Sequence, residues 1–133
     1  GRLGIIIDGT GKDVAKISRQ KALLDQLGYQ CAMIFANTSL EVAQIRNKER
    51  ARTLPEKSVE QMWNGVQRNI GQFLRIFSPI RMLIVDNNRS EKELVTQTLN
   101  TAAKFIRGQL RATPQNLTAK QWIANELQAK KRI

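Results

Sequence analysis

Three short apolar runs constrain the fold of this chain more than any other feature of its sequence. They are Leu3–Asp8, Gln30–Ala36 and Arg81–Asp86, and each is rich in isoleucine, valine or methionine without regular polar alternation. Continuous apolar runs of this length are typical of parallel strands that are covered on both faces. We therefore predict three buried parallel strands.

The segments between these runs carry apolar residues at helical spacing. Gly28 is placed to end the first helix in a left-handed conformation, and a long helix is expected from about Pro55 to Phe77. Two further helix starts are marked by capping boxes, Thr38 with Glu41 and Ser90 with Glu93. Alternating strands and helices predict an α/β fold, a three-layer parallel sheet with helices on both faces.

The end of the chain is set apart as a basic tail. After Gly108 the segment RATPQNLTAK has the composition of a turn, and Thr118 with Gln121 then predicts the start of a short helix that carries Trp122. The expected division is a domain over residues 1–107 and a helical tail over residues 108–133.

Composition limits the classes of function. Lysine and arginine total 22 against 11 acidic residues, a net charge of +11 that favours polyanionic partners such as nucleotides or nucleic acid. The chain has no histidine, which removes imidazole bases, and its single cysteine, Cys31, has no disulfide partner within it. No apolar run approaches the roughly 20 residues that span a bilayer, and no signal peptide begins the chain, so we expect a cytoplasmic protein without a membrane partner.

Two motifs suggest contacts with phosphate. Asp8 ends the first apolar run and is followed by Gly9-Thr10-Gly11, an arrangement that can hold Mg²⁺ or bring the backbone close to a ligand, although a helix cap or a simple turn explains it equally well. Arg46 and Arg50 lie four residues apart and would repel each other on a helix unless an anion lay between them. The alternative is a solvated surface helix, but the Leu54-Pro55 break that follows favours a mobile arginine-bearing lid.

The last apolar run ends in Asp86-Asn87-Asn88, which lies at the same predicted sheet edge. These residues could flank a base or ribose, but turn chemistry alone explains them, and the turn is the favoured interpretation. The aromatic residues Trp63, Phe73 and Phe77 occur at helical spacing among aliphatic residues, so we predict that they form core.

Three segments together resemble the P-loop kinases of the polynucleotide kinase and zeta toxin group. They are IIIDGTGKD, LGYQCAMIFANTSLEVAQIRNKERARTLP and MLIVDNN, so the resemblance runs from about Gly4 to Phe105. The middle segment is the most specific, because a helix that ends in Arg-Asn with a second arginine three residues after the asparagine is uncommon in generic α/β sequences. The fold implied is of the P-loop nucleoside triphosphate hydrolase type.

The resemblance implies roles for individual residues. Arg46 and Arg50 match the lid arginines that contact the nucleotide phosphates, and Asp8 matches the carboxylate that ends the Walker B-type strand and supports Mg²⁺. Candidate nucleotide or phosphate contacts of lower specificity are Thr10, Lys12, Arg52 and Asn87. The activity implied is ATP-dependent transfer of the γ-phosphoryl group to a hydroxyl acceptor such as a nucleic acid or a nucleotide.

One departure from the family pattern is large. The phosphate-binding loop G-x-x-x-x-G-K-[ST] does not occur in these residues, and Gly9-Thr10-Gly11-Lys12 is too short to replace it. We therefore expect that the chain begins midway through a kinase and is inactive alone. The rival interpretations are a non-catalytic nucleic-acid-binding module, which the basic charge favours, and an assembly protein that docks through the Trp122 helix.

Overall fold

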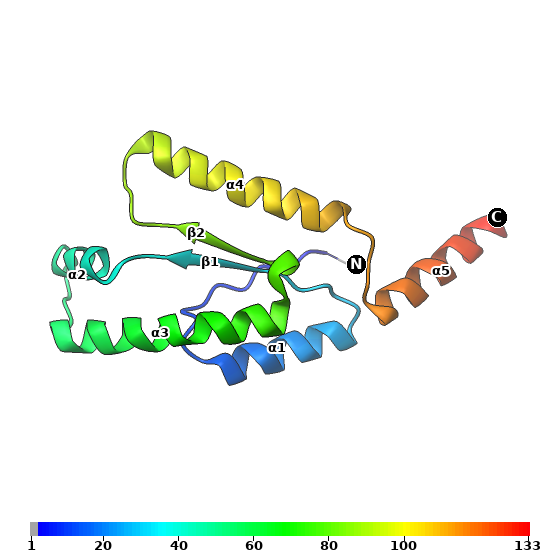
Figure 1. The fold of residues 1–133 in the computed structure, drawn as a ribbon. Helices are drawn as coiled ribbons and strands as arrows, with labels where there is room; N and C mark the ends of the chain where they lie inside the picture. The colour runs from blue at the N-terminus through cyan, green and yellow to red at the C-terminus, as the bar shows by residue number, and fades with distance from the viewer. Residues whose placement is uncertain (1–2) are drawn as a thin grey trace.

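The computed structural model describes residues 3–133 as five α-helices, a short 3₁₀ helix and two strands (Figure 1). The elements are α1 (Val14–Gln26), β1 (Met33–Asn37), α2 (Leu40–Lys48), α3 (Glu56–Phe77), η1 (Pro79–Arg81), β2 (Met82–Asp86), α4 (Lys92–Arg111) and α5 (Leu117–Lys131). The long helix predicted from about Pro55 to Phe77 is confirmed by α3. None of the helices in the described part of the chain is long and apolar enough to cross a membrane.

The sheet is smaller than predicted. Within residues 3–133 it consists of β1 and β2, which pair in parallel with Met33 opposite Met82 and Asn37 opposite Asp86. The predicted three-layer parallel sheet of the P-loop nucleoside triphosphate hydrolase type is therefore wrong, because a single pair of strands among five helices cannot form it.

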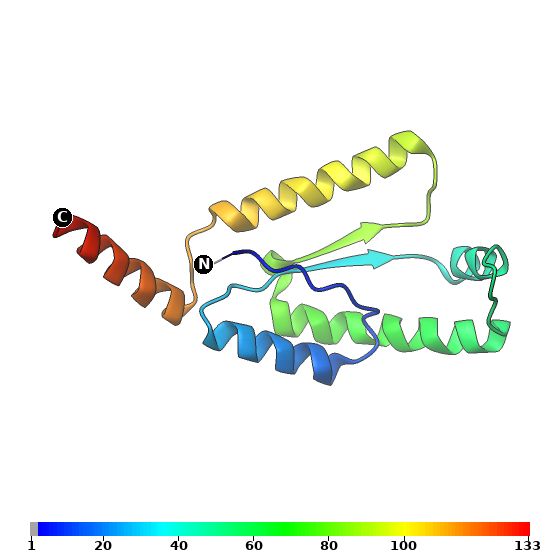
Figure 2. The same cartoon turned by 180° about the vertical axis from the view of Figure 1, so that it is seen from behind.

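The missing third strand is Leu3–Asp8. This segment is exposed and runs in the same direction as the strands (Figure 2), but it forms no ladder with either of them. It is tied to the rest of the molecule at its start, where the Tyr29 hydroxyl donates to the Leu3 carbonyl over 3.0 Å. Apolar sequence alone does not make a strand, since each N–H and C=O group also needs a partner on a neighbouring strand.

The core lies between the sheet and α3. Phe35 from β1, Phe73 and Phe77 from α3, and Met82 from β2 are buried together, and Val14 and Ile17 from α1 pack against them. Phe35 and Phe73 have ring centroids 6.4 Å apart, within the range of favourable aromatic pairs. The predicted core role of Phe73 and Phe77 is thus confirmed, and α1 and α3 lie on one side of the sheet with α4 on the other (Figure 1).

Local sequence signals account for the ends of α1. Asp13 accepts a hydrogen bond from the Lys16 amide over 2.9 Å and caps the first turn. At the other end Gly28 has φ 94°, with its N–H bonded to the Asp25 carbonyl and the Tyr29 N–H bonded to the Leu24 carbonyl. This is the left-handed cap that the sequence predicted at Gly28.

The predicted starts of the later helices need correction. Ser39, and not Thr38, caps α2, since its Oγ accepts from the Val42 amide over 3.2 Å. The N-cap residue of α4 is Glu91, which makes no side-chain cap bond, so the predicted capping box of Ser90 and Glu93 does not form. Asn116, and not Thr118, caps α5.

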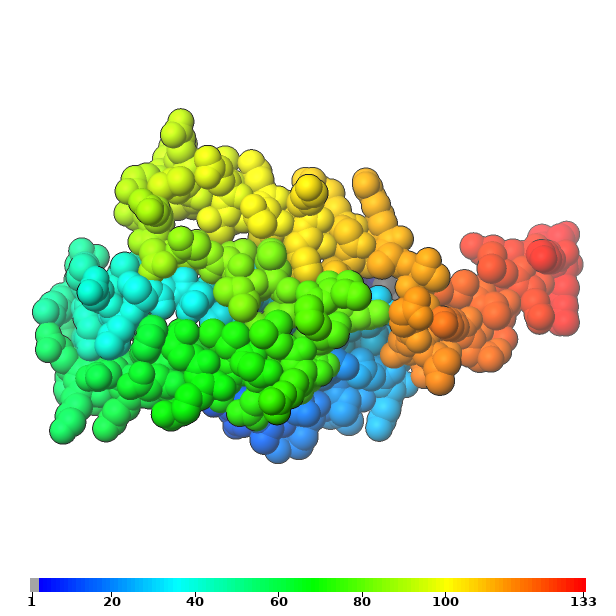
Figure 3. Space-filling view, viewed as in Figure 1, coloured from blue at the N-terminus to red at the C-terminus, as the bar shows by residue number. Residues whose placement is uncertain are grey.

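The boundary between α4 and the tail also differs from the expectation. α4 continues through Gly108 to Arg111, so the turn lies at residues 112–116 and is shorter than predicted. Beyond it α5 extends away from the body of the molecule (Figure 3).

Candidate functional site

The carboxyl edge of the sheet carries the residues that follow β1 and β2. The Asn88 side chain joins the two strand ends, because its Oδ1 accepts from the Ser39 amide over 2.6 Å while its Nδ2 donates to Asp86 Oδ1 over 2.7 Å. The Asn88 amide also donates to Asp86 Oδ1, over 2.8 Å. These bonds support the favoured interpretation of Asp86 and Asn88 as turn residues.

Asn87 lies between them at the same edge. Its amide donates to the Asn37 carbonyl over 2.8 Å, which continues the strand pairing by one residue. Asn37 is fixed in turn, since its Oδ1 accepts from Gln67 of α3 over 2.8 Å. The Asn87 side chain itself is exposed and makes no hydrogen bond to another residue in 3–133, so it stays a candidate ligand contact.

A short loop after α2 carries the predicted arginines. We call residues 49–54 the arginine loop. Asn47, at the end of α2, is buried and closes this loop by two bonds to Leu54, one in which its Nδ2 donates to the carbonyl over 2.8 Å and one in which its Oδ1 accepts from the amide over 3.0 Å. Because the side-chain amide of Asn47 bonds both the N–H and the C=O group of Leu54, the end of the loop is held next to the end of α2.

Two further contacts hold the same region. Gln44 Nε2 donates to the Glu56 carbonyl over 2.8 Å, and the Lys48 ammonium pairs with the Glu56 carboxylate over 2.9 Å. Both join α2 to the first turn of α3, on either side of the arginine loop. The ion pair is largely exposed and contributes little stability, so the two bonds from buried Asn47 to Leu54 are the main constraint.

The arginines differ in exposure. Arg46 is half-buried on α2, whereas Arg50 and Arg52 are exposed in the arginine loop. The ion pairs within residues 3–133 are Lys21–Asp25 and Lys48–Glu56, so none of the three arginines is neutralised by a carboxylate of the described chain. Three guanidinium groups lie within seven residues of the sequence, and all of them can accept an anionic ligand.

The residues predicted from the first apolar run lie in the unpaired segment and the turn after it. Asp8, Thr10 and Lys12 are exposed, and the described chain gives Asp8 no hydrogen bond or ion pair. The turn itself is fixed, since Asn69 of α3 donates to the Gly11 carbonyl over 2.9 Å and to the Lys12 carbonyl over 3.1 Å. Gly11 has φ 71°, and a Cβ there would lie 3.4 Å from the Phe35 ring, so glycine suits this position.

Asp8 lies outside any ready-made metal centre. No group of three or more histidine, cysteine, aspartate or glutamate side chains in residues 3–133 could hold an ion. Mg²⁺ is usually held by one or two carboxylates together with substrate phosphates and water. A single carboxylate such as Asp8 therefore fits Mg²⁺ only in company with the phosphates of a nucleotide.

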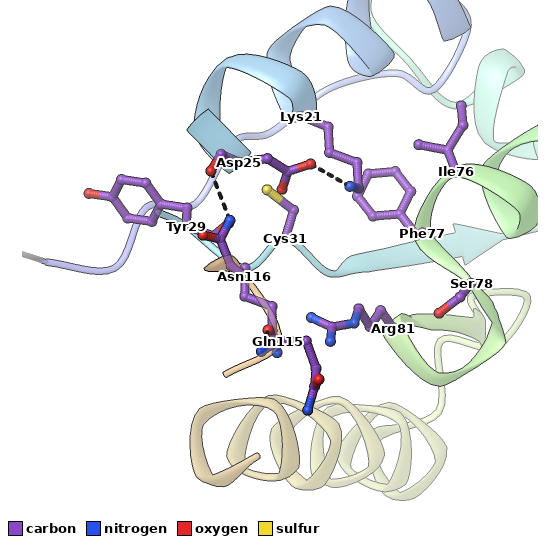
Figure 4. A pocket seen from close by; sticks show the side chains of 11 residues that line it. Lys21, Asp25, Tyr29, Cys31, Ile76, Phe77, Ser78, Arg81, Gln115 and Asn116 are labelled. Carbon is purple, nitrogen blue, oxygen red and sulfur yellow. Dashed lines mark hydrogen bonds and ion pairs between the residues drawn. The ribbon is translucent and has the colours of Figure 1, made fainter. Parts of the chain in front are cut away.

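A pocket lies at the opposite, amino end of the strands. Figure 4 shows side chains from α1, α3, the segments before β1 and β2, and the start of α5 that line it. The Lys21 ammonium pairs with the Asp25 carboxylate over 2.7 Å, and Asn116 Nδ2 donates to the Asp25 carbonyl over 2.8 Å. The pocket is thus the place where α5 is anchored to α1.

Cys31 is half-buried in this pocket and is not activated. Burial raises the pKa of its thiol above the ordinary value, and the negative charge of Asp25, which also accepts a hydrogen bond from the thiol, raises it further. Lys21 and Arg81 oppose this effect without overcoming it. At neutral pH the group is therefore a protonated thiol, which is a poor nucleophile.

Comparison of the chain with protein-family models, curated proteins and solved structures found no match. The site is therefore described by its residues alone. Sequence reasoning placed the arginines on and after a helix, but it gave Asn47 no role. The only signal was an asparagine near the end of a helix before a proline, and nothing in the sequence identifies Leu54 as its partner.

Proposed function

We propose that this chain supplies the phosphate-binding arginines of an ATP-dependent phosphotransferase. The observation that supports the proposal most strongly is the arginine loop, which buried Asn47 closes and which presents Arg50 and Arg52 without a neutralising carboxylate from the described residues. The resemblance of the same segment to the arginine lid of P-loop kinases, which rests on Arg46 and Arg50, is a further support.

The chemistry required of these groups is electrostatic. During phosphoryl transfer negative charge is spread over the oxygens of the γ-phosphoryl group, and guanidinium groups stabilise it because they stay ionised and donate several hydrogen bonds. Arg46, Arg50 and Arg52 are assigned this role. Asp8 is assigned to Mg²⁺, which when bound with ATP would neutralise phosphate charge.

The experiment that tests this proposal measures binding, not turnover. The chain has no G-x-x-x-x-G-K-[ST] sequence, so we expect the purified protein to bind MgATP weakly and not to hydrolyse it. Binding is followed by the broadening of the ATP phosphate resonances in phosphorus NMR. The double variant Arg50→Ala/Arg52→Ala should weaken binding about tenfold or more, since each hydrogen bond to a charged group contributes roughly 1.5–3 kcal/mol.

Two further variants make the test specific. Lys57→Ala/Arg68→Ala removes the same charge from exposed positions on α3 and should leave binding unchanged. Asn47→Ala keeps every positive charge but leaves the Leu54 amide and carbonyl without their partner, and it should weaken MgATP binding while circular dichroism shows the helices intact. Equal loss in the two double variants, or no binding of MgATP by the unmodified protein, would refute the arginine assignment.

A further inference from the structure

The outer face of α4 is basic along its second half. We call its exposed residues Gln97, Asn100, Thr101, Lys104, Arg107 and Arg111 the α4 basic face; their spacing of three, four and seven residues places them on one side of the helix. None of its cations pairs with a carboxylate of residues 3–133. The sequence from Leu94 to Ile133 contains seven basic residues and one acidic residue.

The opposite side of α4 is held against the body of the molecule. Gln109 Nε2 donates to the Ile80 carbonyl over 3.0 Å, and the Thr98 hydroxyl lies 3.4 Å from the Asp86 carbonyl. α4 also contacts β2, beside which it lies in Figure 1. The direction of the α4 basic face is therefore fixed, and it points away from the sheet.

We propose that the α4 basic face binds the sugar-phosphate backbone of a nucleic acid. Lys104 to Arg111 spans roughly 10 Å of helix, and over that length one strand of a nucleic acid presents about three phosphates. Three cations thus meet about three phosphates, while the amides of Gln97 and Asn100 are donors that suit phosphate and sugar oxygens. This inference does not rest on the proposed function of the arginine loop.

A membrane surface is the alternative partner for the same face. Helices that bind in the plane of a bilayer insert large apolar side chains beside their basic residues. The α4 basic face itself consists of amides, a hydroxyl and cations, and the number of its cations matches the number of phosphates along it. Leu94 and Phe105 of α4 are partly buried, whereas Leu99 and Leu110 are 63% and 79% exposed, so vesicle binding is measured as a separate outcome of the test.

The test uses a fluorescein-labelled single-stranded DNA and its duplex, with binding measured by fluorescence anisotropy at several salt concentrations. The variant Lys104→Gln/Arg107→Gln/Arg111→Gln should weaken binding by tenfold or more at moderate salt. It should also make the salt dependence shallower: the negative slope of log K against log salt should shrink in magnitude by about two to three. Each lost phosphate contact removes about 0.7 to 0.9 from that magnitude.

The matched control is Lys57→Gln/Arg68→Gln/Arg75→Gln, which removes the same charge from exposed positions spread along α3. It should reduce binding only slightly, and glutamine keeps the helix propensity of both helices. Equal effects of the two triple variants, or binding to phosphatidylserine vesicles but not to DNA, would overturn the proposal. Retained MgATP binding by the α4 variant would separate this surface from the arginine loop.

Discussion

At the scale of single residues, polar side chains that bond to the backbone decide the shape of the candidate site. Asn47 satisfies both backbone groups of Leu54, and Asn88 joins the ends of the two strands. The Asn47–Leu54 and Asn88–Ser39 contacts pair residues that no short sequence pattern relates. The arginines were picked out by their local spacing, and their role stays a prediction. The long-range partners of the two asparagines could not be predicted, since they are fixed only by the tertiary fold.

Cys31 gives a prediction about pH. Asp25→Asn removes the negative charge that helps to raise the pKa of the thiol, so the rate of alkylation by iodoacetamide should rise at a lower pH than in the unmodified protein. Lys21→Met breaks the same Lys21–Asp25 ion pair but removes a positive charge, and it should move the rate profile to higher pH. If both variants moved the profile in one direction, loss of the ion pair and not charge would be the cause.

The raised pKa of Cys31 also determines the direction in which pH changes the stability of the folded protein. The thiol has a higher pKa in the folded protein than its ordinary value, so protonated Cys31 favours the folded state below the unfolded pKa. That contribution is lost as the pH rises through the folded-state pKa.

At the scale of elements, the junction between α4 and α5 depends on Asn116. Its Oδ1 accepts from the Ala119 amide over 3.0 Å, and its Nδ2 donates to the carbonyls of Asp25 and Tyr29 over 2.8 and 3.1 Å. One side chain therefore both caps α5 and attaches it to the end of α1. The Gln115 amide adds a bond to Gln30 Oε1 over 2.8 Å.

Replacing Asn116 by alanine should loosen α5 without disturbing the core. A lost cap costs about 1 kcal/mol, which corresponds to roughly fivefold faster amide exchange in the first turn of α5. Hydrogen exchange followed by mass spectrometry would measure this, with α3 expected to keep its protection. Asn125→Ala, at an exposed position of α5, is the control. Unchanged exchange in α5 of the Asn116 variant would mean that other contacts hold the helix.

The elements also show what sequence patterns can predict. α3 was located almost to the residue because its apolar stripe covers many turns and buries Val59, Phe73 and Phe77. Caps were less reliable, since Thr38 and Ser39 are both good caps and only the backbone conformation selects one. The prediction of a strand at Leu3–Asp8 was wrong because apolar sequence was the only signal for it. Whether a segment pairs in a sheet also depends on the segment beside it.

At the scale of the whole molecule, exposure separates the first apolar run from the core. Ile6 is 96% exposed, whereas Phe73 is 0% exposed. Ile6→Ser should therefore change the free energy of unfolding by no more than about 0.5 kcal/mol, while Phe73→Ala should cost about 3–5 kcal/mol. Urea denaturation followed by circular dichroism would give both values. A loss in the Ile6 variant as large as that in the Phe73 variant would contradict the exposed position of Leu3–Asp8.

The parallel pairing of β1 with β2 has a consequence for folding. Met33 pairs with Met82, and α2, α3 and η1 lie between them in the chain, so no tight turn can bring the strands together. Pairs this distant in sequence form late, because the loop between them must be closed first. On the ribosome, β1 remains an apolar strand without a partner until β2 has been synthesised, and the nascent chain is open to misassociation during that interval.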